Sequence, residues 1–254
     1  MVDRNLPVRT GNPGLNAKTF AGLPRAASAS EAMTLQGTIN KSFVLLLVLM
    51  ATALYTWSQY MVSGNPADVS VPMIGGLFAG LILALIISFK PTAAPYLSIP
   101  YAACEGLALG GISAMFERKY PGIAIQAVGL TFGVMAALLF AYTSRLIRVT
   151  QRFRSIVVGA TLGIALFYVV TMVLGFFHVN VGQVYGPSTL GIVVSLVVVG
   201  VAALNLVLDF DMIEAGVAQG APRYMEWYSA FGLLVTLVWL YMEMLRLLRN
   251  LQSR

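Results

Sequence analysis

The chain has 254 residues, of which 58% are hydrophobic and only 10% are charged, and its mean hydropathy is +0.81. Soluble domains carry about 25% charged residues, so this composition excludes a water-soluble enzyme and indicates an integral membrane protein. The formal net charge is +6. The basic residues lie in short clusters between apolar segments, which favours contact with the anionic surface of the lipid bilayer over contact with nucleic acid.

Residues 1–42 form a polar segment rich in Pro, Gly, Ala and Ser, and no apolar signal-peptide stretch precedes residue 43. We expect this segment to be a flexible cytoplasmic tail, followed by a membrane domain over 43–254. Apolar stretches of roughly 20 residues, the length that crosses a bilayer core of about 30 Å, occur near 43–62, 71–89, 97–116, 122–143, 155–177, 188–210 and 228–248. The sequence therefore predicts an all-α, polytopic bundle of seven transmembrane helices. The third stretch contains Pro100 and Glu105, and a re-entrant segment there would leave six spans.

Two features of the spacing bear on packing and orientation. Three pairs of glycines four residues apart predict close helix packing: Gly76 with Gly80, Gly106 with Gly110, and Gly129 with Gly133. With seven spans and the N-terminus inside, 11 of the 16 Lys and Arg residues fall on the inner side, which favours a cytoplasmic N-terminus. The cluster Arg145 to Arg154 is the strongest anchor of this orientation.

Acidic residues within apolar segments are the candidate functional residues, because a membrane makes them costly. Each also has a structural interpretation. Glu243 can pair with Arg246 three residues on, Asp209 and Asp211 can be solvated at a helix end, and Glu105 can be a protonated, hydrogen-bonded group in the bundle interior.

The acids lie at three depths, which suggests a path for cations or protons. Carboxylates with few basic partners can be neutralised by protons or by cations. Calcium, a hard cation, suits carboxylate oxygens better than zinc or copper do. With one cysteine (Cys104) and one histidine (His178), the chain offers no cysteine and histidine metal cluster, and we expect no cofactor beyond a permeant calcium ion.

Four strings carry a resemblance to a known family: MTLQGTINKS (33–42), APYLSIPYAACEGLALGGIS (94–113), LNLVLDFDMIEAG (204–216) and EWYSAFGLLVTLVWLYMEMLRLL (226–248). With them the chain resembles the Bax inhibitor-one/YccA-like family, also called the transmembrane Bax-inhibitor-motif family, and its bacterial branch in particular. The resemblance implies seven helices with the last one central, and a pH-sensitive calcium leak. It also implies that Asp211, in a Phe-Asp step, and Glu243, in a Leu-Tyr-x-acid step, form the gate.

A depth count leaves the contact between these two acids open. If the last two helices are straight and turn near Gly220 to Pro222, Asp211 and Glu243 differ in depth by roughly 15 to 20 Å. Direct contact would need a kink or a broken helix, and Asp209, Glu105 or Glu214 are the alternative partners. Asp211 and Glu243 are also the candidate transient ligands of calcium.

The leading hypothesis is a pH-sensitive cation leak, with calcium as the expected ion, in a bacterial inner membrane. The alternative is a non-conducting protein that modulates a membrane protease or a stress response, for which the polar tail offers a contact surface. An enzyme is not expected, because the spans contain no nucleophile and base pair and no metal cluster.

Overall fold

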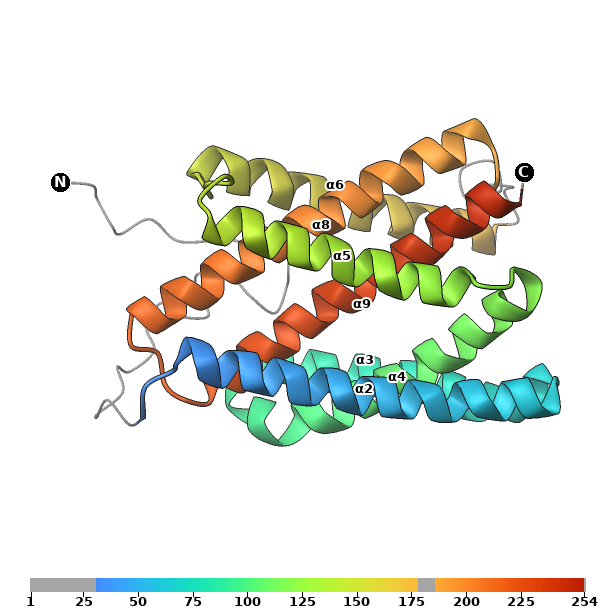
Figure 1. Cartoon of the computed structure of the whole chain (residues 1–254), viewed down its shortest axis with the longest axis horizontal. Helices are drawn as coiled ribbons and strands as arrows, with labels where there is room; N and C mark the ends of the chain where they lie inside the picture. Colours follow the sequence, from blue (N-terminus) through green and yellow to red (C-terminus); the bar gives the residue numbers. More distant parts are fainter. Residues whose placement is uncertain (1–30, 178–185, 254) are drawn as a thin grey trace.

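The computed structural model describes residues 31–177 and 186–253, and most of them belong to seven long helices (Figure 1). All seven are long and apolar enough to cross a membrane. The helices are α2 (Leu35–Ser63), α3 (Pro66–Phe89), α4 (Ala94–Lys119), α5 (Ile123–Thr143), α6 (Gln151–Phe176), α8 (Thr189–Ala218) and α9 (Met225–Gln252), with a short 3-10 turn, η2 (Pro91–Ala93), before α4. The predicted all-α bundle of seven spans is confirmed.

The third hydrophobic segment is a full span. The helix α4 runs for 26 residues without a break, although Pro100 lies inside it. A proline within a membrane helix is tolerated where neighbouring helices and local adjustments satisfy the freed backbone groups, and α4 is packed against α2, α3 and α9. The alternative of a re-entrant segment with six spans is therefore not what the chain adopts.

Several helices extend beyond the apolar stretches that predict them. The helix α2 begins at Leu35, within the segment assigned to the polar tail, and α8 continues to Ala218. Side chains cap the helix starts: Thr34 accepts a hydrogen bond from the backbone of Gly37, and Ser188 does the same for α8. Hydropathy locates the part of a helix inside the bilayer, whereas capping residues set where the helix begins.

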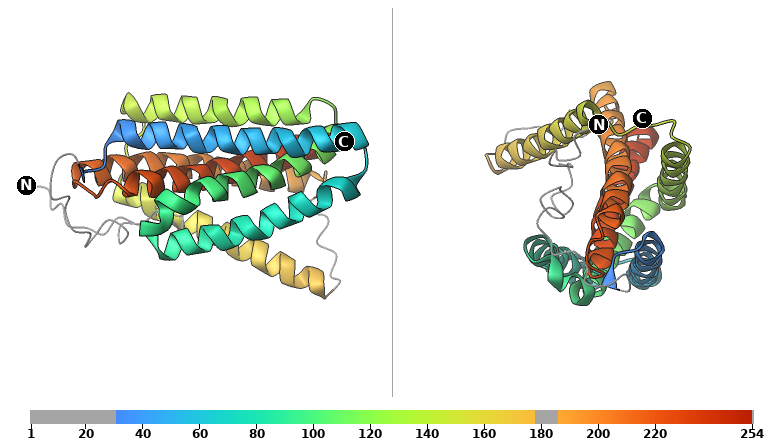
Figure 2. Two further views of the ribbon diagram at one scale, coloured as in Figure 1. Left: turned by 90° about the horizontal axis from the view of Figure 1, so that it is seen from below. Right: turned by 90° about the vertical axis from the view of Figure 1, so that its left-hand side faces the viewer.

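The last helix, α9, is central in the bundle. It packs against α2, α4, α5 and α8, and it contributes to both large apolar clusters. Phe231 belongs to the cluster shared with α2 and α4, and Leu240 to the cluster shared with α5 and α8. The helix α3 packs on α4, and α6 packs mainly on α8. Figure 2 shows that one end of α6 diverges from the other helices. The prediction of a central last helix is confirmed.

Two of the three glycine pairs serve close helix packing. A Cβ atom on Gly110 would lie 2.1 Å from the carbonyl oxygen of Ala53 in α2, and one on Gly76 would lie 2.5 Å from the carbonyl oxygen of Cys104 in α4. These contacts hold α2, α3 and α4 together with backbones in close approach. The prediction is wrong for Gly129 and Gly133, where an added Cβ would meet no atom of residues 31–177 or 186–253 within 4 Å.

Candidate functional site

A stripe of polar side chains follows one face of α6. Arg154, Thr161 and Tyr168 are each seven residues apart, which is about two helical turns, so their side chains project on the same side. Each makes a hydrogen bond to a different polar group of α8 or α9. We call these three layers of contacts the α6 seam.

The first layer joins α6 to the end of α8. Arg154 donates a hydrogen bond of 2.5 Å to Asp211 Oδ2, and both side chains are largely covered. One turn further along α8, the exposed Glu214 accepts a hydrogen bond of 2.5 Å from the hydroxyl of Tyr142 on α5. Asp211 is thus paired with an arginine and lies near a second carboxylate that is tied to α5.

The middle layer is uncharged and lies beside a deeply buried acid. Asn205 Nδ2 donates to Thr161 Oγ1 at 2.8 Å and to the carbonyl oxygen of Val201 at 2.9 Å. Asp209 lies four residues further along α8, so it projects on the same side as Asn205, and 0% of its surface is exposed. This acid therefore lies at a height between the first and middle layers.

The third layer connects α6 to the central helix. Glu243 is 2% exposed, and its Oε1 accepts a hydrogen bond of 2.8 Å from the hydroxyl of Tyr168. Arg246 donates to Glu243 Oε2 at 2.9 Å and to the Tyr168 hydroxyl at 2.5 Å. The Arg246 guanidinium also lies 5.1 Å from the centroid of the Tyr168 ring. The Glu243 and Arg246 pair that the sequence left open as a structural interpretation is present.

The structure does not pair Asp211 with Glu243. Each carboxylate has its own arginine, one supplied by α6 and one by α9. Counting residues from the α8–α9 connection gives a difference in height of roughly 16 Å. The two acids are therefore separate layers of one seam, linked through the face of α6. Sequence reasoning missed Arg154, Tyr168 and Asn205 as partners, although the seven-residue spacing on α6 was visible.

Glu105 lies outside the seam, on the side of α4 that faces α3. It hydrogen-bonds Tyr101 one turn earlier on α4, and Tyr101 in turn packs edge-on against Phe231 of α9, with ring centroids 4.9 Å apart. Gly80 of α3 leaves room for the carboxylate, because a Cβ there would lie 3.2 Å from Glu105 Oε1. Glu105 is therefore half-buried between α3 and α4, and the structure does not bring it to Asp211 or Glu243.

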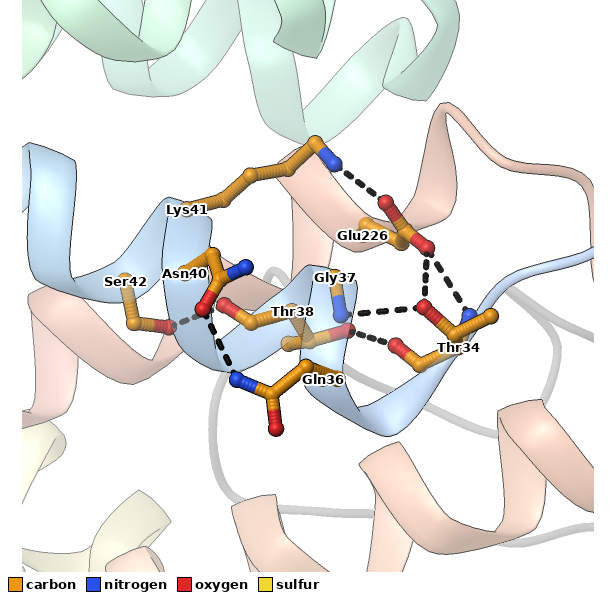
Figure 3. Close-up of polar contacts among 8 residues, drawn as sticks. All are labelled: Thr34, Gln36, Gly37, Thr38, Asn40, Lys41, Ser42 and Glu226. Atoms are coloured by element: carbon orange, nitrogen blue, oxygen red, sulfur yellow. Dashed lines mark hydrogen bonds and ion pairs between the residues drawn. The ribbon is translucent and has the colours of Figure 1, made fainter.

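A third buried acid, Glu226, connects the start of the central helix to the start of α2 (Figure 3). Its Oε1 accepts hydrogen bonds of 2.9 Å from both the backbone nitrogen and the hydroxyl of Thr34, and its Oε2 pairs with Lys41. We call the contacts of Thr34, Lys41 and Glu226 the Glu226 latch. The latch requires glycine at position 37, since a Cβ there would lie 2.2 Å from Glu226 Oε1.

Backbone pairing reinforces the latch. The nitrogen of Met33 donates to the carbonyl oxygen of Ala221 at 2.7 Å, and the nitrogen of Arg223 donates to the carbonyl oxygen of Glu31 at 2.8 Å. The segment before α2 therefore runs antiparallel to the α8–α9 connection. Sequence reasoning overlooked Glu226 because an acid in the first turn of a helix is ordinarily explained by the helix dipole. Its function here is to fix one end of α9.

The described residues contain no group of three His, Cys, Asp or Glu side chains placed to hold a metal ion. Asp211 and Glu243, the candidate calcium ligands, are in different layers and each is engaged by an arginine. In this arrangement a cation can bind only one of the two carboxylates at a time, and only after the arginine paired with that carboxylate has moved away. His178 lies outside the described residues.

Comparison with known proteins identifies the family. The profile of the family described as Bax inhibitor 1 like matches residues 12–253. No curated protein and no solved structure matches the chain. The matched region includes all seven helices, the α6 seam and the Glu226 latch. The chain is an integral membrane protein that belongs to the Bax inhibitor 1 like family.

Proposed function

We propose that the protein is a leak channel for cations, with calcium as the expected ion, and that protonation of buried carboxylates opens it. The observation that carries the proposal is the α6 seam, in which carboxylates of α8 and α9 contact one face of α6 at two heights, with an uncharged layer between them. Ionisable groups at membrane depth are costly and characteristically mark ion or proton pathways.

The seam as described is a closed pathway. Arg154 occupies Asp211 and Arg246 occupies Glu243, so both carboxylates are already neutralised by a fixed cation. A mobile cation entering the seam would meet a guanidinium group beside each carboxylate, and like charges repel. The arginines therefore block the pathway for cations as long as the carboxylates are ionised.

Protonation weakens this closure. A neutral Asp211 no longer attracts Arg154, which leaves a buried, uncompensated guanidinium that is stabilised by moving toward water. At Asp211 the other groups in reach are Glu214 and Tyr142, and at Glu243 they are Tyr168 and Trp239. Because α6 packs mainly on α8, loss of these ties lets α6 separate from α8 and α9. Flux is then expected to rise as pH falls.

The remaining oxygens of the seam suit a hard cation. Asn205 and Thr161 offer amide and hydroxyl oxygens between the two arginine layers, and calcium takes oxygen ligands with flexible geometry. A low-affinity, transient contact fits a leak better than a storage site does. The distribution of basic residues supports a cytoplasmic N-terminus, and we place the protein in a bacterial inner membrane.

The test is calcium flux into liposomes that contain only the purified full-length chain and an enclosed calcium dye, recorded from acidic to alkaline pH. We expect flux that increases as pH falls, and an Asp211→Asn variant that conducts at neutral pH because Arg154 has lost its charged partner. Asp68→Asn, which removes an exposed carboxylate in the first turn of α3, is the matched control. Flux equal to that of empty liposomes at every pH would favour the alternative, a non-conducting protein that modulates a membrane protease.

A further inference from the structure

An apolar cavity of about 320 Å³ lies between α2, α4, α5 and α9. Its lining comes from all four helices and includes Trp57, Leu109, Phe132 and Leu237. None of the seam residues lines it. Small-molecule sites in proteins occupy about 300 to 1,000 Å³, so the cavity is large enough to hold a ligand or part of a longer one.

The cavity opens sideways out of the bundle. Leu54 of α2 and Ile125 of α5 both line it, and they keep 62% and 72% of their surface exposed. They belong to the outer faces of two helices that are long and apolar enough to cross a membrane. The mouth of the cavity is therefore continuous with the lipid-facing surface, and the medium outside it is hydrocarbon.

Water is a poor occupant of this cavity. Ser113 and Tyr241 are hydrogen-bonded to each other at 2.6 Å, and the Thr131 hydroxyl donates to the carbonyl oxygen of Ala127 at 2.7 Å. A buried water needs two to four polar partners, and these hydroxyls are already engaged. An empty cavity would leave its lining without dispersion contacts on one side. An apolar acyl chain needs no polar partner and restores these dispersion contacts.

Two cations lie near one end of the cavity. Arg118 and Lys119 are exposed at the end of α4, five and six residues beyond Ser113, which is roughly 8 Å along the helix axis. The neighbouring Glu117 accepts hydrogen bonds from the backbone nitrogens of Gly122 and Ala124 at 2.6 and 3.0 Å, so its charge is directed into the α4–α5 turn. Basic residues at the membrane surface attract anionic lipid headgroups.

We propose that the cavity binds one acyl chain of an anionic phospholipid, whose phosphate lies against Arg118 and Lys119 at the end of α4, where the Arg118 guanidinium is 5.8 Å from the ring of Tyr60 on α2. The apolar lining suits the acyl chain of such a lipid, and the pair of cations at one end suits its phosphate. The mouth of the cavity opens to the hydrocarbon layer in which the lipid lies. The acyl chain of the lipid lies between α2 and α5. It contacts α9 at the inner end of the cavity, at Leu234, Leu237, Val238 and Tyr241. The bound lipid is thus a structural ligand of the central helix, separate from the α6 seam.

The test is native mass spectrometry of the detergent-solubilised full-length chain, supplied with phosphatidylglycerol or phosphatidylcholine. We expect one phosphatidylglycerol molecule to remain bound per chain. Val128→Phe, which adds volume to the cavity lining, should reduce its retention at least tenfold. Val169→Phe adds the same volume on an exposed face of α6 and is the matched control that should keep the lipid.

A second variant tests the headgroup contact independently of the cavity. Replacing Arg118 and Lys119 by Gln alters exposed residues only, and it should abolish the preference for phosphatidylglycerol over phosphatidylcholine while one lipid is still retained. Equal lipid retention by Val128→Phe and the unmodified chain would overturn the proposal. So would a cavity filled by detergent alone, or a second copy of the chain bound in place of lipid.

Discussion

Arg154 on α6 and Asp211 on α8 are 57 residues apart in the chain, yet their side chains are joined by a hydrogen bond of 2.5 Å. This ion pair closes one end of the α6 seam, and the contact between Tyr168 and Glu243 closes the other. Because α6 packs mainly on α8, these polar contacts are important among the interactions that hold α6 against the other helices.

Removing the guanidinium of Arg154 should open the seam at neutral pH. The pair is partly covered, so its loss should destabilise the closed state by about 2 kcal/mol, between the values for surface pairs and buried pairs, which corresponds to an open fraction about 30-fold larger. Calcium flux of Arg154→Gln in liposomes at neutral pH measures this. Arg152→Gln, an exposed arginine two residues earlier on α6, is the control, and equal flux in both variants would show that Arg154 does not hold the gate.

The two charged layers should contribute independently to gating. Asp211 and Glu243 have different arginine partners and share no hydrogen-bond partner among the described residues, and effects of distant, unconnected sites add within about 0.5 kcal/mol. The logarithms of the flux changes for Asp211→Asn and Glu243→Gln should therefore sum to that of the double variant. A coupling well above this limit would mean that the two acids titrate as one unit.

Glu105 should not set the pH dependence of flux. It lies between α3 and α4, with Tyr101 as its hydrogen-bond partner, and neither of these neighbours belongs to the seam. Glu105→Gln preserves the size of the side chain and should leave the pH profile of flux unchanged. A profile displaced along the pH axis would place Glu105 in the pathway.

Gly37 should be intolerant of a side chain because of the Glu226 latch. A Cβ at this position would lie 2.2 Å from Glu226 Oε1, so Gly37→Ala must displace the carboxylate from Thr34 and Lys41, at a cost of about 1–3 kcal/mol. Thermal unfolding in detergent should show a lower midpoint temperature. Gly159→Ala is the control, since an added Cβ there meets no atom within 4 Å and alanine favours the helix by about 1 kcal/mol.

The sequence predicts the helices well because each needs about 20 apolar residues to cross a bilayer, and that requirement is local. The glycine contacts are predictable only in part: Gly110 meets the backbone of α2, but Gly129 meets no other helix. The partner of Asp211 could not be predicted, because which face of α6 meets α8 depends on packing between distant segments. Glu243 and Arg246, three residues apart on one helix, could be paired from sequence.

If cations pass when α6 separates from α8, a reversible cross-link between these two helices should block them. Asn205 Nδ2 and Thr161 Oγ1 are 2.8 Å apart across the two helices, so replacing both residues by cysteine, with Cys104 changed to serine, puts two thiols on facing sides of the middle layer, where oxidation can join them in a disulfide. We predict that the oxidised protein conducts no calcium at acidic pH and that a reductant restores the flux, while either single cysteine variant conducts under both conditions. Equal acid-activated flux in the oxidised and reduced forms would contradict the account, because ions would then be passing without movement of α6.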